Sequence, residues 1–302
     1  MLKNLSVENL YGLYNYSLDF SKSEDERLKI ITGPNGYGKT TILQLIYALF
    51  CKDMDLLHQI PFSSLSFSID DYLIRVVQTR TSVQTDEESD LPGDEQISVH
   101  FEMDGQKYSK IDGQLELVLN TLKCFYLTDK RVLLRNEEQR KRMENADTDS
   151  SMDALANRIV EIIARGDNER GVIFFQELVK FFGFADKEMI MDNRFGIRFK
   201  MNNASRTIIP ITALSSGEKH VLLQLFELVF DGKAGDLVMI DEPELSFHPA
   251  WLNMYVRVLE RIQNFKLEEK REMQIVLATH SPMLVAGRWD DTLDLYSLRK
   301  NG

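Results

Sequence analysis

The feature that most constrains this chain is a glycine-rich stretch near its N-terminus, Gly33–Thr41. It fits the pattern G-x-x-x-x-G-K-[ST] without a mismatch. Residues 28–32 precede it as a short apolar strand, and residues 41–50 follow it with the apolar spacing of a helix. This context predicts a phosphate-binding loop rather than a chance glycine-rich turn, because inward-facing backbone N–H groups and a helix N-terminus together attract anions.

The residue types within this loop predict its contacts. We expect Lys39 to reach the β- and γ-phosphates of a nucleotide and the Thr40 hydroxyl to bind Mg²⁺. The full set of nucleotide-binding residues predicted from this stretch is Asn35, Gly36, Gly38, Lys39, Thr40 and Thr41.

Length and composition restrict the class of protein. The 302 residues allow one large domain or two smaller ones, and 43% hydrophobic residues suffice for a packed core. No apolar run approaches the roughly 20 residues of a membrane span. Cys51 and Cys124 are too few for a disulfide framework, so we expect both to be reduced core residues of a cytoplasmic protein. The net charge of -11 argues against a surface that is basic all over, but it leaves a local DNA-binding patch open.

The hydrophobic pattern predicts a single domain over residues 1–302 with two additions. Residues 2–10 and 14–20 alternate as antiparallel strands that lead into the phosphate-binding loop. Repeated alternation and an Asp-Gly turn predict a β-rich arm at about 67–112. Residues 115–122 read as a short helix and 123–128 as a strand. Two amphipathic helices then predict a helical insertion at about 130–190, and alternation returns at 194–201.

Two further stretches carry candidate nucleotide contacts. Leu214–His220 opens an apolar helix, and alone its serine-glycine turn is no more than a helix start. Leu237–Pro243 is an apolar strand that ends in two carboxylates, which could also be the start of a solvated loop. Downstream of a phosphate-binding loop, we predict that Asp241 holds Mg²⁺ and that Glu242, on the other side of the strand, faces the attacking water.

A third apolar strand ends in His280. A lone histidine is usually structural. This one follows Gln274–Thr279, at the edge where parallel strands present their carboxyl ends beside the other phosphate-handling residues. We therefore predict that His280 senses the γ-phosphate.

These motifs, in this order and spacing, resemble the ABC-type ATPase superfamily. The closest likeness is to its soluble branch of RecF, the SMC and double-strand-break-repair ATPases, and the OLD-family ATPase domains. Gly33–Thr40 is similar to Walker A, Leu214–Glu218 to the ABC signature, and Leu237–Glu242 to Walker B. Glu244–Pro249 is similar to the E-x-x-x-H-P stretch of the RecF and OLD branch, and Ala278–Pro282 to the switch-histidine loop.

The resemblance implies an α/β P-loop NTPase with an ABC-ATPase-type mixed sheet, an antiparallel β subdomain and a small helical insertion. It further implies ATP hydrolysis in a head-to-tail homodimer that sandwiches two ATP–Mg²⁺. Ser215, Ser216 and Gly217 would contact the γ-phosphate bound to the partner subunit. Glu242 would be the general base and His280 the switch.

The glutamine loop of the family has two candidates here. Gln78 lies at the end of a strand, roughly where transporter ATPases carry this residue. The SMC branch places it after the strand at 125–128, where this chain has no glutamine. Relatives in phage-defence operons carry an arginine after this strand, which makes Arg131 the other candidate.

The remaining expectations concern partners. The insertion is too short for an SMC coiled coil, and the chain ends at Gly302 without a Toprim nuclease domain, so we expect a nuclease or toxin effector on a separate chain. An anti-phage ATPase that clamps or senses DNA is the first hypothesis. A RecF-like repair ATPase, a nucleotide-gated scaffold with little turnover and, more weakly, a transporter subunit are the alternatives. A basic cluster would either meet double-stranded DNA or form a solvated helix paired with nearby glutamates. It comprises Arg131, Arg135, Arg140, Lys141 and Arg142.

Overall fold

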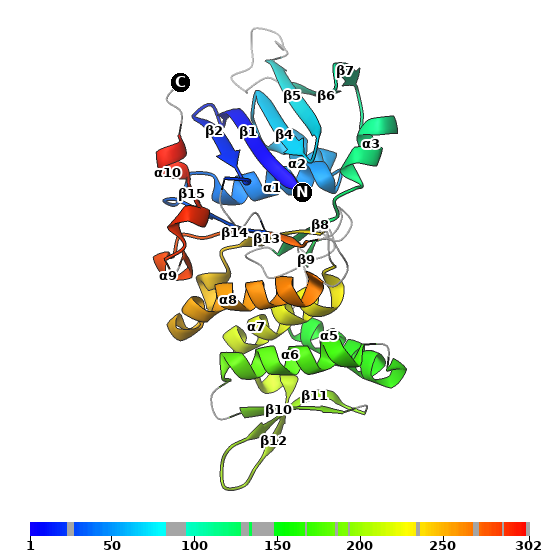
Figure 1. The fold of residues 1–302 in the computed structure, drawn as a ribbon, viewed down its shortest axis with the longest axis vertical. Coiled ribbons are helices and arrows are strands. Elements are labelled where there is room, and N and C mark those ends of the chain that lie inside the picture. Colours follow the sequence, from blue (N-terminus) through cyan, green and yellow to red (C-terminus); the bar gives the residue numbers. More distant parts are fainter. Residues whose placement is uncertain are drawn as a thin grey trace, which may run out of the picture.

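The computed structural model describes residues 1–22, 27–82, 95–127, 133–134, 148–166, 168–184, 187–192, 194–233, 236–267, 272–285 and 287–299. The described elements are stacked in layers along the long axis of the molecule (Figure 1). A six-stranded antiparallel sheet occupies one end, and helix α1 (Lys39–Phe50) lies between it and a mainly parallel sheet. A layer of helices and a small three-stranded sheet complete the other end.

The mainly parallel sheet has the strand order β15-β3-β14-β13-β8-β9, and β9 alone among these strands pairs antiparallel. Successive residues of β13 alternate between two hydrophobic cores: Leu237 and Met239 face the α1 side, and Val238 and Ile240 face the other helices. Burial of both faces explains why these strands are continuous apolar runs. The strands are β3 (Leu28–Thr32), β8 (Cys124–Leu127), β9 (Leu133–Leu134), β13 (Leu237–Asp241), β14 (Gln274–Ala278) and β15 (Thr292–Asp294).

The antiparallel sheet has the order β2-β1-β4-β5-β6-β7. The predicted pairing of the two N-terminal strands is confirmed, with Leu5 opposite Leu18. Leu5 also lies opposite Phe67 of β4, so the strands expected as an arm continue the sheet that β1 and β2 begin. The strands are β1 (Leu2–Leu10), β2 (Tyr14–Asp19), β4 (Ser64–Ile69), β5 (Tyr72–Ser82), β6 (Glu95–Met103) and β7 (Gln106–Tyr108), with helices α2 (Met54–Gln59) and α3 (Gly113–Leu119) beside them.

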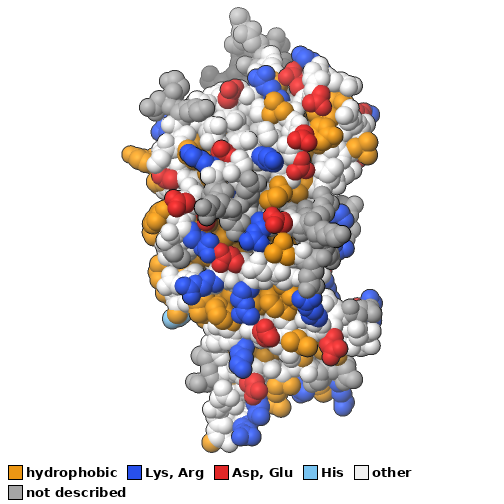
Figure 2. Space-filling model, in the orientation of Figure 1, with side chains coloured by type: hydrophobic (Ala, Val, Ile, Leu, Met, Phe, Trp, Pro, Cys, Tyr) orange, Lys and Arg blue, Asp and Glu red, His pale blue; other side chains and the backbone are white. Residues whose placement is uncertain are grey.

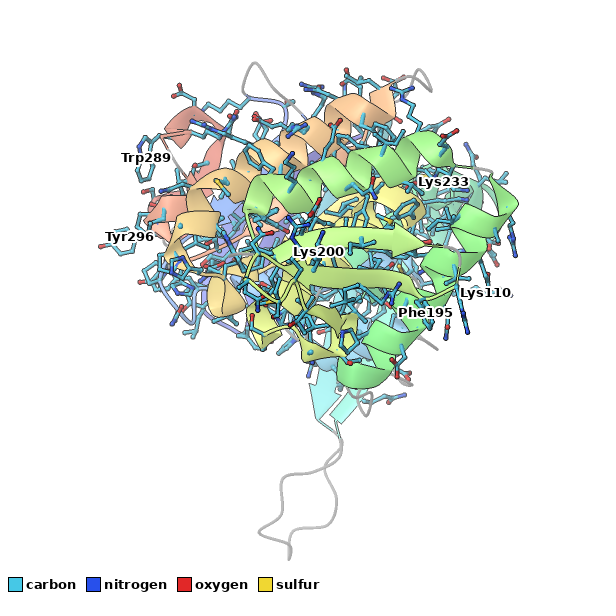
Figure 3. The ribbon with its side chains drawn as sticks, turned by 90° about the horizontal axis from the view of Figure 1, so that it is seen from below. Lys110, Phe195, Lys200, Lys233, Trp289 and Tyr296 are labelled. Carbon is cyan, nitrogen blue, oxygen red and sulfur yellow. The ribbon has the colours of Figure 1, made fainter. Side chains whose placement is uncertain are left out.

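The other face of the parallel sheet is covered by helices whose aromatic side chains interlock. Phe175 and Phe226 meet edge to face with ring centroids 6.0 Å apart, and Tyr255 is fully buried. Seen from this end, the three-stranded sheet lies over the helices with Lys200 on its middle strand (Figure 3). The helices are α5 (Thr148–Arg165), α6 (Glu169–Phe182), α7 (Ser216–Phe226) and α8 (Pro249–Lys266), and the strands are β10 (Lys187–Asp192), β11 (Gly196–Met201) and β12 (Ile208–Pro210).

Short helical segments connect these layers, and several of them border the site described below. They are η1 (Ile211–Ala213), the π-helix η2 (Glu227–Asp231), η3 (Pro243–Ser246), α9 (Pro282–Val285), η5 (Trp289–Asp291) and α10 (Leu295–Leu298).

The surface carries both signs of charge. Figure 2 shows acidic and basic side chains interspersed among the described residues of one face. Among the helices of the described ranges, none is both long enough and apolar enough to cross a membrane. Cys51 is half-buried and Cys124 buried, and both are free thiols.

Candidate nucleotide-binding site

The parallel pairing of three strands brings the predicted motifs to one edge of the sheet. Asp241 at the end of β13 lies opposite Ala278 at the end of β14, and Ala278 lies opposite Ile31 of β3. Parallel neighbours end on the same side, so the loops that follow these strands are adjacent. The phosphate-binding loop, the turn at Glu242 and the loop of His280 therefore form one site.

The loop after β3 leaves the N-terminus of α1 open. Gly36 and Gly38 both have φ of 85°, the left-handed region that glycine adopts without strain. Gly38 is the N-cap of α1, no side chain caps this end, and the first turn contains no acidic residue. The free N–H groups and positive end of the helix dipole therefore remain available to an anion. Asn35 and Gly36 are exposed at the loop tip, whereas Thr41 is buried in the first turn.

Lys39 places its charge at the centre of the site. Its side chain is only 4% exposed. The Nζ ammonium donates hydrogen bonds to the carbonyl oxygens of Gly33, at 3.0 Å, and Pro34, at 3.4 Å. It also lies 3.7 Å from Glu242 Oε1. A cation held this close to the helix N-terminus adds to the attraction for phosphate.

Thr40 and Asp241 supply two oxygen atoms of the kind that Mg²⁺ prefers. The Thr40 hydroxyl donates to Asp241 Oδ1 at 3.1 Å. Tyr126 of β8 donates its hydroxyl to Asp241 Oδ2 at 3.0 Å and so fixes the carboxylate from the other side. The donor set thus fits the cation, although these residues alone would leave most of its ligands to water and phosphate.

The role of Tyr126 was missed in the sequence. Its signal was weak: a side chain with a polar tip within the apolar strand at 124–127, next to the strand that ends in Asp241. A buried tyrosine hydroxyl generally needs a hydrogen-bond partner.

Glu242 owes its direction to a backbone turn rather than to strand alternation. It lies just after β13 with φ of 41° and ψ of 56°, a left-handed conformation that costs a non-glycine residue on the order of 1–3 kcal/mol. Its N–H donates to the carbonyl of Ala278 at 2.9 Å, which holds the turn against β14. The carboxylate is 22% exposed and lies between Lys39 and His280, whose Nδ1 is 3.5 Å from Oε1.

His280 meets two carboxylates. Besides Glu242, its Nδ1 lies 3.2 Å from Oε1 of Glu244, a residue of η3. The ring is 42% exposed, so it can still be approached from solvent. Glu244 was not among the predicted site residues, although its position in the Glu-Pro-Glu sequence after β13 was visible.

The signature turn, residues 215–217, is hydrogen-bonded to Glu218 and is partly exposed to solvent. Ser215 is the N-cap of α7 in a capping box with Glu218: the Ser215 N–H and hydroxyl donate to Glu218 Oε2 at 2.9 and 2.8 Å. The Lys187 ammonium donates to Glu218 Oε1 at 2.5 Å. Burial alone would raise the pKa of Glu218, but the hydrogen bonds from Lys187 and Ser215 outweigh it and hold the pKa below its ordinary value. Ser215 and Ser216 are exposed and Gly217 is half-buried.

The signature turn and the phosphate-binding loop belong to different layers. The apolar side chains of α1 pack into one core and those of α7 into the other, so the parallel sheet separates the two helices (Figure 1). One chain therefore brings Lys39, Thr40, Asp241, Glu242 and His280 together, while the helix that its serine turn opens packs on the other face of the sheet.

One of the two glutamine-loop candidates, Gln78, is bonded in another part of the fold. The Gln78 amide is buried: its Nε2 donates to the carbonyls of Leu57 and Ile60 at 2.8 and 3.1 Å, and its Oε1 accepts from Phe62 N–H and Arg80 Nε at 3.2 and 2.9 Å. These bonds join α2 to β5 and occupy the hydrogen-bonding capacity of the amide. Arg131 lies outside the described residues.

Comparison with known proteins identifies relatives over most of the chain. Residues 29–286 match the family described as "AAA domain, putative AbiEii toxin, Type IV TA system". Septu protein PtuA from Bacillus thuringiensis is 24% identical over an alignment of 316 positions, which covers 94% of this chain and 73% of PtuA.

Solved structures agree on the fold. The SMC head domain from Thermotoga maritima matches with a TM-score of 0.50 and 17% identity over 94% of this chain and 90% of that domain. The SMC head bound to the C-winged helix domain of ScpA matches with a TM-score of 0.52 and 14% identity over 94% and 91% of the two chains. These likenesses show the P-loop α/β fold of ABC-type ATPase heads. With a family match across residues 29–286, the chain belongs to this AAA-domain family.

Proposed function

We propose that this protein binds ATP with Mg²⁺ and hydrolyses it to ADP and phosphate. The observation that carries the proposal is the convergence of a lysine, a threonine–aspartate pair, a second carboxylate and a histidine at one sheet edge. The matched family supports it, since it is a family of AAA-domain proteins.

Each residue has a proposed task. The open end of α1, with Asn35, Gly36, Gly38 and Thr41, binds the phosphates. Lys39 exchanges its loop carbonyl partners for phosphate oxygens. Thr40 and Asp241 hold Mg²⁺, which when bound neutralises charge that develops on the phosphate oxygens.

Glu242 accepts the proton of the attacking water, and His280 faces the γ-phosphate as the switch. The Lys39 ammonium lies 3.7 Å from Glu242 Oε1, on one side of the carboxylate that would accept this proton. We assign Gln78 to the junction of α2 and β5, where its amide is already bonded, and leave Arg131 as the candidate for the glutamine-loop position.

The second half of the site comes from another copy of this chain. The exposed turn of Ser215, Ser216 and Gly217 would contact the γ-phosphate held by the partner subunit in a head-to-tail dimer. The separation of α1 and α7 by the parallel sheet supports this assignment. ATP binding then joins the subunits and hydrolysis separates them.

The test is Mg²⁺-dependent phosphate release by the purified chain, compared with Glu242→Gln. The variant keeps the shape of the side chain but removes the base, so hydrolysis should fall by about 100-fold or more while ATP binding is retained. Glu177→Gln, at an exposed position on α6, is the matched control and should change neither quantity. Hydrolysis at the wild-type rate by Glu242→Gln would refute the base assignment, and a wild-type chain that binds ATP without turnover would favour the scaffold alternative.

For the biological role, we propose an ATPase of anti-phage defence that regulates a nuclease or toxin effector on a separate chain. The match to Septu protein PtuA and the toxin–antitoxin description of the matched family support this reading over a RecF-like repair ATPase. Co-purification with the product of a neighbouring nuclease or toxin gene, lost on removal of ATP, would test it. Co-purification with replication proteins alone would favour repair.

DNA binding is the least direct part of the proposal. All five residues of the basic cluster, Arg131, Arg135, Arg140, Lys141 and Arg142, lie outside the described residues. If Arg140 and Lys141 meet phosphates, charge reversal of both should weaken DNA binding and flatten its salt dependence. Unchanged affinity and salt dependence would remove this cluster from the proposal.

A further inference from the structure

The carboxylate of Glu244 is a buried group that the proposed chemistry does not use. It belongs to η3, two residues after Glu242, and its side chain is 6% exposed. Its Oε1 accepts the Thr279 hydroxyl at 2.5 Å and the His280 N–H at 3.0 Å, and it lies 3.2 Å from His280 Nδ1. Backbone, side-chain hydroxyl and ring of the histidine loop thus converge on one oxygen.

The distance of 3.2 Å between His280 Nδ1 and Glu244 Oε1 is short enough for the ring to donate to this oxygen. An ionised carboxylate only accepts hydrogen bonds, so a ring nitrogen at this distance must carry its proton on Nδ1 to bond to it. The other nitrogen, Nε2, lies on the far side of the imidazole and is left for a phosphate. A carboxylate that accepts a hydrogen bond from one ring nitrogen of a histidine generally sets both the tautomer and the direction in which the other nitrogen points.

Glu244 also determines how His280 interacts with the proposed base. The same Nδ1 is 3.5 Å from Glu242 Oε1, compared with 3.2 Å from Glu244. Without Glu244, the Nδ1 proton has Glu242 as its nearest described carboxylate. A hydrogen bond there would occupy the oxygen that Glu242 needs for water.

Burial makes a purely structural role for this carboxylate unfavourable. Within the described residues, Glu244 Oε2 is buried and has no hydrogen-bond partner. Burial of the Tyr255 hydroxyl raises its pKa, the nearby Glu244 carboxylate adds to that rise, and the hydroxyl donates to Gln224 of α7 at 2.9 Å. A buried carboxyl group with one oxygen left without a hydrogen bond costs stability compared with an apolar side chain of similar shape.

We propose that Glu244 is a positioning residue that holds His280 with Nδ1 toward itself, and so keeps Nε2 toward the γ-phosphate and Glu242 free for water. This inference rests on the proposed function for its consequence in hydrolysis. The orientation of the ring can be measured without turnover.

The first test uses the ring itself. Nitrogen-15 spectra of the histidine side chains, with His280 assigned by the loss of its signals in His280→Gln, report which nitrogen carries the proton. We expect Nδ1–H in the wild-type chain. In Glu244→Leu the Nδ1 signal should shift because its proton loses the partner at 3.2 Å and turns to Glu242, and the shift should be smaller in Glu244→Gln, whose amide oxygen can still accept. Glu177→Gln should leave the spectrum unchanged. Identical His280 signals in the wild-type chain and both Glu244 variants would overturn the proposal.

The second test is a double-mutant cycle on hydrolysis. Glu244→Gln should lower kcat about tenfold with ATP affinity within about threefold of wild type, the range seen when a group that orients another is removed. In the His280→Ala background the same change should have no further effect, because Glu244 acts through the ring. An equal loss in both backgrounds would mean that Glu244 acts independently of His280. If the wild-type chain does not hydrolyse ATP, the proposed function fails, and the spectra still decide the position of the ring.

Discussion

The two halves of the proposed ATP site differ in how the chain holds them. The half at the sheet edge is internally bonded: Lys39 lies against Glu242, and Thr40 against Asp241. In the signature half, Ser215 is bonded to Glu218, and Ser215 and Ser216 are exposed. The residues of the first half contact one another within one chain, whereas the second half lies at the exposed start of α7.

This difference separates two kinds of contribution to catalysis. Residues that bond to each other before the nucleotide arrives are already oriented, which lowers the cost of reaching the transition state. A rigid turn on another surface can contribute only when a second molecule brings a phosphate to it. The comparison therefore predicts that changes in the first half affect chemistry within one chain, and that changes in the second affect association.

The largest effect should come from the lysine at the centre of the first half. Lys39→Ala removes the charge that faces the phosphates, and we expect ATP affinity to fall by about 100-fold or more, in line with the loss of a charged, buried partner. Titration with a fluorescent ATP analogue measures this. Lys107→Ala, at a position 75% exposed, is the control. Undiminished affinity in Lys39→Ala would break the assignment of this loop as the phosphate site.

A smaller effect should follow from a change at Tyr126, whose hydroxyl bonds to Asp241 of the first half. Tyr126→Phe removes the hydroxyl that donates to Asp241. We expect the Mg²⁺ concentration needed for half-maximal hydrolysis to rise about tenfold, as for other groups that orient a metal ligand. A Mg²⁺ titration at saturating ATP measures the midpoint. The midpoint should move while the rate at high Mg²⁺ largely recovers; a lowered rate with an unmoved midpoint would contradict a role in orienting the metal ligand.

The smallest effect concerns the stability of the signature half. Glu218→Ala breaks the capping box, and we expect the free energy of unfolding to fall by about 1 kcal/mol near neutral pH. Because the pKa of Glu218 is lowered in the folded chain, its contribution is present above the unfolded pKa of about 4.3 and is lost as pH falls through the folded value. Denaturant unfolding at several pH values should show the gap between wild type and variant closing below that range. A gap that widens in acid would contradict the sign.

Much of this site could be predicted because its motifs are local. Gly33–Thr41 and the strands that end at Asp241 and before His280 each combine a short apolar run with a polar end, and parallel pairing then brings those ends together. The turn at Ser215 was likewise visible as a helix start, although its exposure was not.

Other features depended on contacts far apart in sequence. Tyr126 reaches Asp241 across 115 positions, which no local pattern encodes. The left-handed backbone of Glu242 is held by Ala278, and strand alternation gave a different reason for its direction. The pairing of β4 with β1 joins the expected arm to the N-terminal sheet, because alternation identifies strands but not their neighbours. The sequence left the Gln78 amide available for a nucleotide, whereas in the structure it donates to the carbonyls of Leu57 and Ile60.

The most direct test of the two-chain site compares mass in solution with and without ATP–Mg²⁺, in the Glu242→Gln background that prevents turnover. ATP should raise the light-scattering mass of Glu242→Gln, and the added substitution Ser215→Arg should abolish that increase while single-chain ATP affinity stays within about threefold. Ser205→Arg, at an exposed turn between β11 and β12, should still associate. If the Ser215→Arg chain gains mass with ATP as fully as its parent, the signature turn does not close over a partner's nucleotide.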